Sequence, residues 1–257
     1  MIQERLKALR AEMEKRGITV YVVPTADFHE SEYVGDHFKA RKFITGFTGS
    51  AGTAVITLDE AGLWTDGRYF VQAENQLKDS TVTLYRMGEE GVPTVDEFVK
   101  DRLKEGGCLG FDGRVVNGTW GGRLEKIAAE KNVSMHVTED LIDLIWEDRP
   151  ALSKQPLFIL EEKYSGKSTA DKIGDLRKAM KENGADVHIL TSLYDIAWLL
   201  NIRGNDIDYV PVVLSYLVLN ETECIWFLQE EVVDDKIRAY LEENHITTKP
   251  YDAIYDY

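Results

Sequence analysis

The sequence predicts two similar α/β domains with mixed β-sheets, the second of them truncated. Two observations support this fold class. The chain has 257 residues, which is long for a single domain, because domains cluster around about 100–150 residues. In addition, one segment occurs twice, and each copy is a helical pattern followed by an apolar strand. We therefore expect a first domain over residues 1–155 and a second over residues 156–257.

The repeated segment is a helix that ends at a glycine and leads into a strand. Five residues recur in the same order and at the same spacing, namely Leu9, Arg10, Met13, Gly17 and Val20 in the first copy and Leu176, Arg177, Met180, Gly184 and Val187 in the second. In each copy, apolar residues at helical spacing precede the glycine, which can take the left-handed conformation that stops a helix. The apolar run after it predicts a buried strand, which would make His188 a structural residue.

Turn and capping signals predict the other elements of the first domain. Apolar stretches at 53–57 and 62–64 flank a turn at Asp59-Glu60, which is typical of an antiparallel hairpin, and a helix over 69–77 follows. Thr94 and Glu97 form a capping box. Further expected elements are a strand at 108–111, a helix that Thr119 caps and that runs to Lys131, a strand at 133–137 and a last helix at 141–146.

The second domain starts in the same way and then stops early. Ser168 and Asp171 predict a helix start. A hairpin over 212–219 and 224–226 parallels the first hairpin, with Trp226 in the place of Trp64, and a helix over 232–241 follows. No counterpart of the elements at 94–146 exists in the sequence. The last residues, 251–257, are rich in tyrosine and have no polar tail, so we expect a fragment of a longer protein.

Composition excludes several classes of partner. The chain has 30 Lys and Arg against 45 Asp and Glu, a net charge of −15. Such a surface repels phosphate backbones and anionic lipids, so we expect neither a nucleic acid nor a membrane as a partner. We find no signal peptide and no apolar run that could span a bilayer, and therefore expect a cytoplasmic protein. Cys108 and Cys224 are interpreted as reduced core residues.

Few residues combine into a catalytic pattern. His29, Asp36 and His37 form the densest group of possible metal ligands, but their spacing is not that of a metal site, and we interpret them as part of a solvated loop. The glycine-rich stretch from Gly46 to Thr53 matches neither a phosphate loop nor the turn that carries a nucleophilic serine, because Ser50 is not followed by a helix. We interpret this stretch as a tight connection that allows close backbone approach.

Asp66-Gly67-Arg68 lies between a strand and the helix that starts near Tyr69. In one interpretation it is only a turn, with Asp66 capping the helix and Arg68 in solvent. In the other, Arg68 stands at the mouth of a site and donates hydrogen bonds to a carboxylate or a peptide carbonyl. The residues alone leave both interpretations open.

Four stretches carry a resemblance to a known family. Residues 46–57 (GFTGSAGTAVIT), 63–70 (LWTDGRYF), 145–150 (IWEDRP) and 195–206 (DIAWLLNIRGND) resemble, in order and spacing, the non-catalytic part of the long, three-domain Xaa-Pro aminopeptidases. The resemblance covers essentially the whole chain. It implies two creatinase-N-type, ribonuclease H-like α/β domains, which accounts for the internal repeat.

The resemblance also implies an activity that this chain does not carry by itself. Members of the family remove an N-terminal residue that precedes proline, with two metal ions, usually manganese, in a separate catalytic domain. We therefore expect no catalytic residue and no metal ligand within the 257 residues. The implied partners are that catalytic domain, a second copy of the protein in a homodimer, and a proline-containing peptide.

One site residue transfers from the family, namely Arg68, which corresponds to a substrate-contacting position. Asp66, Arg203 and Asp206 are further possible residues of the site rim. Two alternatives to a non-catalytic fragment of an aminopeptidase remain. The first is a stand-alone binding or regulatory module built from the same domains, and the second is an independent hydrolase that uses Ser50 or the His29, Asp36 and His37 group.

Overall fold

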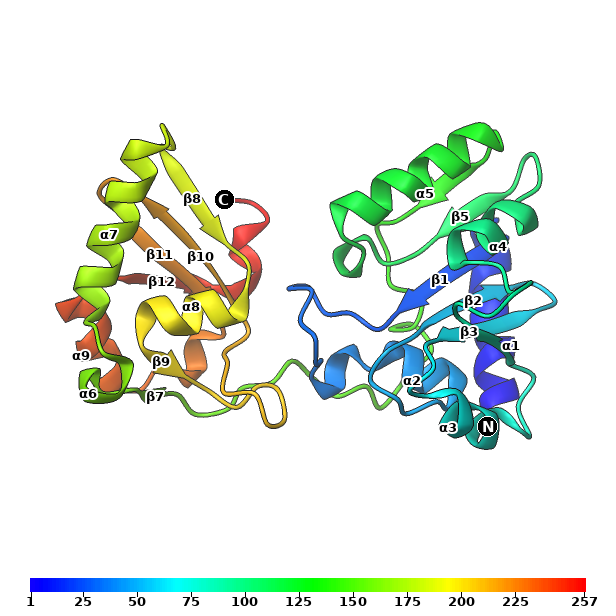
Figure 1. The fold of residues 1–257 in the computed structure, drawn as a ribbon, viewed down its shortest axis with the longest axis horizontal. Helices are drawn as coiled ribbons and strands as arrows, with labels where there is room; N and C mark the ends of the chain where they lie inside the picture. Colours follow the sequence, from blue (N-terminus) through cyan, green and yellow to red (C-terminus); the bar gives the residue numbers. More distant parts are fainter. The chain divides into compact units, whose positions relative to one another are not determined.

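A computed structural model describes all 257 residues and divides the chain into two units, Met1–Ala151 and Leu152–Tyr257 (Figure 1). Each unit has its own sheet and its own core. They are called unit 1 and unit 2 below. No helix is long and apolar enough to cross a membrane.

Unit 1 is built on a six-stranded mixed sheet of order β4-β3-β2-β1-β5-β6. Strand β1 lies between β2 and β5 (Figure 1). It is antiparallel to β2 and parallel to β5, and β4 and β6 are parallel to their neighbours. The strands are β1 (Val20–Pro24), β2 (Thr53–Thr57), β3 (Ala61–Thr65), β4 (Thr83–Arg86), β5 (Cys108–Gly110) and β6 (Ser134–His136).

Helices cover both faces of this sheet, because successive strand residues point to opposite sides. Tyr21 and Val23 face one core with α1, α2 and α3, while Val20 and Val22 face the other with α4 and α5. The helices are α1 (Ile2–Lys15), α2 (Ala40–Thr45), α3 (Phe70–Leu77), α4 (Val95–Arg102) and α5 (Gly118–Glu130), with 3-10 turns at Asp36–Phe38 and Gly113–Val115.

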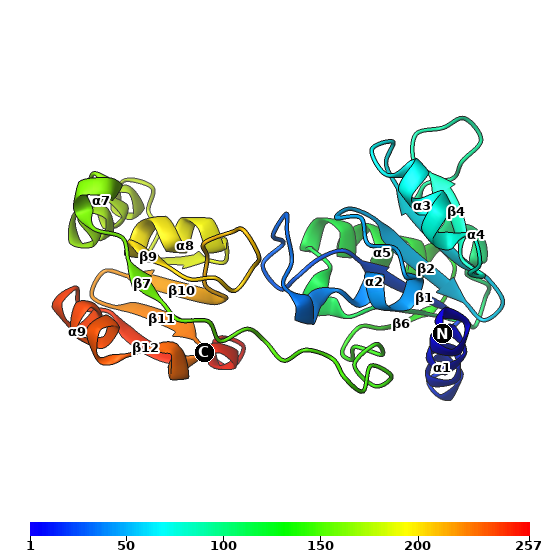
Figure 2. The ribbon, with the colours of Figure 1, turned by 90° about the horizontal axis from the view of Figure 1, so that it is seen from below.

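Unit 2 has a four-stranded sheet of order β12-β11-β10-β8 and a two-stranded sheet of β7 and β9. Figure 2 shows α7 and α8 on one side of β10 and β11, and α9 contributes to the same core. The elements are β7 (Phe158–Ile159), α6 (Glu162–Ser165), α7 (Thr169–Glu182), β8 (Val187–Leu190), α8 (Leu193–Leu200), β9 (Ile202–Arg203), β10 (Ser215–Asn220), β11 (Cys224–Leu228), the 3-10 turns Glu230–Val232 (η3) and Tyr251–Ile254 (η4), α9 (Asp235–Glu243) and β12 (Thr247–Pro250).

The structure confirms the internal repeat at the level of topology. In both units a helix leads into a strand that pairs antiparallel with a hairpin, and a helix then leads into a strand parallel to the hairpin. The order β12-β11-β10-β8 in unit 2 therefore corresponds to β4-β3-β2-β1 in unit 1. Gly17 and Gly184 both have positive φ, +67° and +66°, as expected of residues that stop a helix.

The predicted equivalence of Trp64 and Trp226 is wrong by one residue. Thr53 of β2 corresponds to Tyr216 of β10. Thr53 pairs with Trp64, whereas Tyr216 pairs with Phe227. Trp226 therefore corresponds to Leu63 and faces the helix-covered core of unit 2. A shift of one residue moves a side chain to the other face of a sheet, and matching the two tryptophans ignored this alternation.

Three other expectations for local structure are also wrong. Residues 141–146 form consecutive turns and no helix, although Leu141 and Ile142 are fully buried. Asn117 and not Thr119 caps α5, because its side chain accepts the Trp120 N–H. Strand β8 is largely exposed, so His188 is not in a buried strand.

The capping box at Thr94 and the cap at Ser168 are confirmed. Both cysteines are buried and free, as predicted.

Candidate functional site

Arg68 lies on the turn between β3 and α3, where it is paired with Asp66. Its Nε and Nη2 atoms donate to the two carboxylate oxygens of Asp66 at 2.8 and 2.9 Å. The same carboxylate accepts the Arg68 backbone N–H at 3.0 Å. These hydrogen bonds from Arg68 lower the pKa of Asp66 to about 2. The Arg68 side chain is 69% exposed, and its bonds to Asp66 use Nε and Nη2, which leaves the N–H groups of Nη1 for another acceptor.

Asp66 does not cap α3, contrary to the turn interpretation. Tyr69 is the N-cap residue of α3, and no side chain caps the helix. The carboxylate of Asp66 is instead used to hold Arg68. The two residues form a preorganised, net neutral pair at the surface of unit 1.

Tyr69 connects Arg68 to the glycine-rich loop. The Arg68 guanidinium lies 5.2 Å from the centre of the Tyr69 ring, and the Tyr69 hydroxyl is 2.6 Å from the Ser50 hydroxyl. Thr48 in the same loop is tied to α3, because its backbone N–H donates to Gln76 and its hydroxyl accepts from Gln72. We call Thr48, Ser50, Asp66, Arg68 and Tyr69 the polar rim.

The loop needs glycine where it passes Tyr69. A Cβ atom on Gly49 would lie 2.2 Å from Cζ of Phe47 and 2.9 Å from the Tyr69 ring. Such distances are far shorter than van der Waals contact. Gly49 therefore allows the close backbone approach that the glycine-rich sequence predicts.

Arg41, a buried arginine that the sequence analysis missed, supports the glycine-rich loop. Arg41 on α2 is 3% exposed and donates to the carbonyl oxygens of Phe47, at 2.7 Å, and of Gly49, and to the Thr25 hydroxyl at 3.0 Å. It has no carboxylate partner, and burial lowers its pKa to about 10. The signal was available, because Arg41 falls on the buried stripe of α2 with Ile44 and Thr45.

The structure places Arg203 and Asp206 in backbone contacts of unit 2. Arg203 donates to the carbonyl oxygens of Ala197 and Ile202, near the end of α8. Asp206 is buried, and its carboxylate accepts the backbone N–H of Leu214 at 2.8 Å. Burial raises the pKa of Asp206. In this structure both side chains are hydrogen-bonded to backbone groups of unit 2.

Lys172 is a second buried cation that the sequence analysis missed. It is 2% exposed, and its Nζ donates to Trp198 O at 2.7 Å and to the Asn201 side chain at 2.6 Å. Together with Arg203 it satisfies carbonyl groups at the end of α8, where cations are favoured by the helix dipole. Burial lowers the pKa of Lys172.

The His29, Asp36 and His37 group is not assembled into a metal site. His29 is buried, although the sequence analysis expects it in a solvated loop. Asp36 pairs with Lys39. His37 lies 2.8 Å from the carbonyl oxygen of Pro150, and burial lowers its pKa. The structure contains no group of three or more His, Cys, Asp or Glu side chains that could hold a metal ion.

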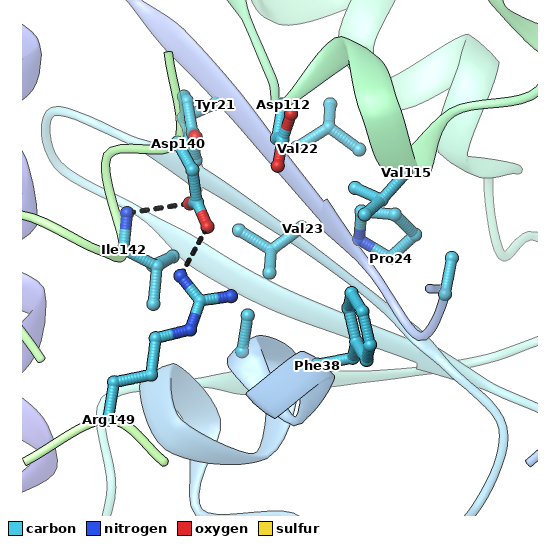
Figure 3. A pocket seen from close by; sticks show the side chains of 12 residues that line it. Tyr21, Val22, Val23, Pro24, Phe38, Asp112, Val115, Asp140, Ile142 and Arg149 are labelled. Atoms are coloured by element: carbon cyan, nitrogen blue, oxygen red, sulfur yellow. Dashed lines mark hydrogen bonds and ion pairs between the residues drawn. The ribbon is translucent and has the colours of Figure 1, made fainter. Parts of the chain in front are cut away.

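A cavity at the carboxyl ends of β1 and β5 is too small for a substrate. It measures about 20 Å³, which is room for a single water molecule. Figure 3 shows Arg149 pointing at Asp140 across it. Arg149 donates to Asp140 at 2.6 Å, and Asp140 accepts the Ile142 N–H at 2.9 Å. The ion pair at this cavity thus joins the two ends of the 140–149 segment, and Arg149 Nε ties the segment to the rest of unit 1 by donating to the carbonyl oxygen of His37 at 2.9 Å.

Comparison with known proteins places both units in one family. The profile of the creatinase/prolidase N-terminal domain matches residues 5–145, and a second profile with the same description matches residues 148–257.

Curated relatives match almost the whole chain. A probable Xaa-Pro aminopeptidase P of Sordaria macrospora is 42% identical over 255 residues, which is 98% of this chain and 41% of the relative. Aminopeptidase P1 of Lotus japonicus is 40% identical over 256 residues, again 98% of this chain and 38% of the relative. The chain thus spans about two fifths of the length of the relatives it matches.

A solved structure matches in the same way. It is that of an X-prolyl aminopeptidase from Caenorhabditis elegans, described as a cytosolic enzyme with a di-nuclear active site. The match has a TM-score of 0.94 and 34% identity, and it covers 100% of this chain and 43% of the other.

Proposed function

The chain belongs to the family of creatinase/prolidase N-terminal domains, and from that premise we propose that it is the non-catalytic N-terminal part of a Xaa-Pro aminopeptidase. The full-length enzyme would remove an N-terminal residue that precedes proline. The observation that carries this proposal is the match of the entire chain, through both units, to the X-prolyl aminopeptidase of C. elegans.

The metal ions of the proposed enzyme belong outside this chain. A di-manganese centre needs several carboxylate and imidazole ligands around a shared water. The 257 residues provide no such group. We therefore assign the two metal ions, and all bond-breaking chemistry, to a separate catalytic domain.

Within this proposal the polar rim of unit 1 is the wall of the peptide site. Arg68 is held by Asp66 and still has N–H groups free, so it can donate to a peptide carbonyl without rearranging. The loop beneath is held by Arg41, and its Ser50 hydroxyl lies 2.6 Å from the Tyr69 hydroxyl, which helps to keep Tyr69 and Arg68 in place. The rim binds and orients the substrate.

Two further assignments complete the proposal. We assign the full-length enzyme to the cytoplasm, with support from the cytosolic description of the C. elegans protein. We also assign it a homodimeric state, as the family resemblance implies.

Activity assays on two proteins test the proposal. The full-length protein, loaded with manganese, should hydrolyse an Xaa-Pro-Pro peptide, and the 257-residue chain should neither hydrolyse it nor bind two manganese ions in calorimetry. Turnover by the short chain would favour an independent hydrolase. A full-length protein without peptidase activity that still binds peptides would favour a stand-alone binding module.

A further inference from the structure

Unit 1 contains the tripeptide Asp-Gly-Arg twice, once from Asp66 to Arg68 and once from Asp112 to Arg114. The same three hydrogen bonds hold the arginine in both copies. Arg114 donates its backbone N–H and its Nε to one carboxylate oxygen of Asp112, both at 3.0 Å, and its Nη2 to the other at 3.0 Å. The corresponding distances between Arg68 and Asp66 are 3.0, 2.8 and 2.9 Å. The second copy therefore holds Arg114 as the first copy holds Arg68.

Both copies lie at the same edge of the six-stranded sheet. β1 and β3 are each antiparallel to β2, and β5 is parallel to β1, so β3, β1 and β5 run in one direction. Asp66 directly follows β3, and Asp112 stands two residues after the end of β5. Sheets of α/β proteins bind ligands beyond the carboxyl ends of such strands. The two arginines therefore belong to one binding edge.

The sheet order sets the distance between the two arginines. The order β3-β2-β1-β5 places β3 and β5 three strand spacings apart. With adjacent strands about 4.8 Å apart, the separation is roughly 14 Å. An extended peptide advances about 3.3 Å per residue and covers this separation in about four residues. Residues four apart present the same side of an extended chain, so one peptide can direct carbonyl groups at both arginines.

The segment after β1 connects the two places. The ring of Phe28 lies 4.6 Å from the Arg114 guanidinium. The pKa of Arg68 is raised mainly by its hydrogen bonds to Asp66, and the negative charge of Glu32 contributes. Phe28 and Glu32 thus lie near different arginines, only four residues apart in the sequence. The Arg114 side chain is 49% exposed and that of Arg68 is 69% exposed, so a ligand can reach both guanidinium groups.

We propose that Arg114 is a second peptide-binding arginine, and that Arg68 and Arg114 donate to two main-chain carbonyls of one extended peptide, about four residues apart. Each arginine is paired with an aspartate, which disfavours a charged carboxylate as the ligand and favours a neutral carbonyl. The inference rests on the proposed function, in which the peptide is the Xaa-Pro substrate. Arg114 then favours substrates of about six residues or more, because a shorter peptide that contacts Arg68 does not reach it.

Kinetics with substrates of two lengths test the proposal. The full-length protein, loaded with manganese, is assayed on a tripeptide and an octapeptide that share the same Xaa-Pro start and have amidated C-termini. Arg114→Ala should leave kcat/KM for the tripeptide unchanged and lower that for the octapeptide about tenfold, through KM and not kcat. Arg102→Ala is the matched control and should change neither value. Arg102 donates to Glu60 at 3.0 Å and lies 4.5 Å from the Phe98 ring, but Glu60 belongs to the β2–β3 turn at the opposite edge of the sheet.

A binding measurement on the wild-type 257-residue chain is independent of peptidase activity and of how well the variants fold. In an NMR titration, the octapeptide should shift the Nε–H resonances of both Arg68 and Arg114, and the tripeptide should shift only that of Arg68. An Arg114 resonance that the octapeptide does not shift would overturn the proposal.

The two measurements separate this inference from the proposed function. If the wild-type enzyme cleaves both peptides and Arg114→Ala affects them equally, the inference is wrong and the proposed function stands. If the wild-type enzyme cleaves neither peptide but the Arg114 resonance responds only to the octapeptide, the proposed function is wrong and the two-arginine peptide site stands.

Discussion

Arg68 lies in the polar rim, Arg41 supports the loop beneath it, and the two arginines have opposite environments. Arg68 is exposed and has a carboxylate partner, while Arg41 is buried and has only carbonyl and hydroxyl partners. An exposed ion pair contributes little to stability, so the placement of Arg68 favours a role in binding. A buried guanidinium without a counter-ion is costly unless its donors are used, so the placement of Arg41 indicates a structural role.

Arg68→Ala in the full-length enzyme should lower kcat/KM for Xaa-Pro peptides by roughly ten- to hundredfold. The reason is the loss of a preorganised hydrogen-bond donor to the substrate. Steady-state kinetics measure the effect, and metal content and melting temperature should not change. Arg123→Ala is the control, because Arg123 is another exposed arginine of unit 1 with a single carboxylate partner. Equal kinetics for the two variants would return Arg68 to the interpretation of a plain turn residue.

Arg41→Met should destabilise unit 1 by about 2–3 kcal/mol. The substitution leaves the carbonyl oxygens of Phe47 and Gly49 without their donor in a buried place. Urea denaturation of the 257-residue chain measures the change. Arg41→Lys should give an intermediate loss, because an ammonium group keeps the charge but cannot reproduce the planar set of donors. Wild-type stability of Arg41→Met would show that Arg41 is not the support of the loop.

The sequence could predict that Arg68 and Asp66 lie together, because they are neighbours on one turn. The helical spacing of Arg41 with Ile44 and Thr45 could indicate that Arg41 is buried, but the sequence could not identify the partners of Arg41 or Lys172, because most of them are main-chain carbonyls that no residue type marks. Their burial depends on how α2 and α7 pack, which is tertiary information. Arg203 and Asp206 illustrate the same limit, since polar residues in a loop predict exposure, whereas both are held by the backbone of unit 2.

At the scale of elements, local signals predicted two helix starts correctly, at Thr94 and Ser168, and missed the cap of α5, which is Asn117 and not Thr119. Thr94 and Ser168 cap their helices as expected, because a cap is a contact within three residues. Residues 141–146 have a helical apolar pattern but form turns. Their apolar side chains pack into the core of unit 1, and the Leu141 N–H donates to the Tyr21 hydroxyl. Packing against unit 1 thus holds the segment, together with turn hydrogen bonds from the Ile145 and Trp146 N–H groups to the Ile142 carbonyl oxygen at 3.1 and 3.0 Å.

Gly49→Ala should destabilise the chain by about 1–3 kcal/mol, because the new methyl group overlaps the rings of Phe47 and Tyr69. In the full-length enzyme it should also displace Tyr69 and raise KM. Gly122→Ala is the control. Gly122 lies within α5 with open space around its Cα, so alanine there should stabilise the helix by roughly 0.5–1 kcal/mol. Chemical denaturation measures both changes, and a destabilising effect of the same size at both glycines would argue against a specific close approach at Gly49.

At the scale of the whole molecule, the repeat was visible in the sequence because helix, glycine and strand keep their spacing in both copies. The difference between the copies was visible only as a missing counterpart of residues 94–146. The structure shows what that difference does physically. Unit 1 has a core on each face of its sheet. In unit 2 the segment after β12 covers the second face only over β10 and β11, and β8 is an open edge.

This asymmetry predicts how the chain behaves when it is cut between the units. Residues 1–151 should fold alone, because all strands of the six-stranded sheet are present and both faces are covered. Arg149, which donates to the carbonyl oxygen of His37, should keep the end of this fragment attached to the rest of unit 1. Residues 152–257 should unfold at a lower urea concentration and associate as their concentration rises, because β8 offers an apolar edge. Circular dichroism and sedimentation of the two fragments measure this, with Ile189→Lys as the variant that should suppress association. If the 1–151 fragment unfolds first or fails to fold, two-face coverage is not what stabilises unit 1, and its stability must then depend on unit 2.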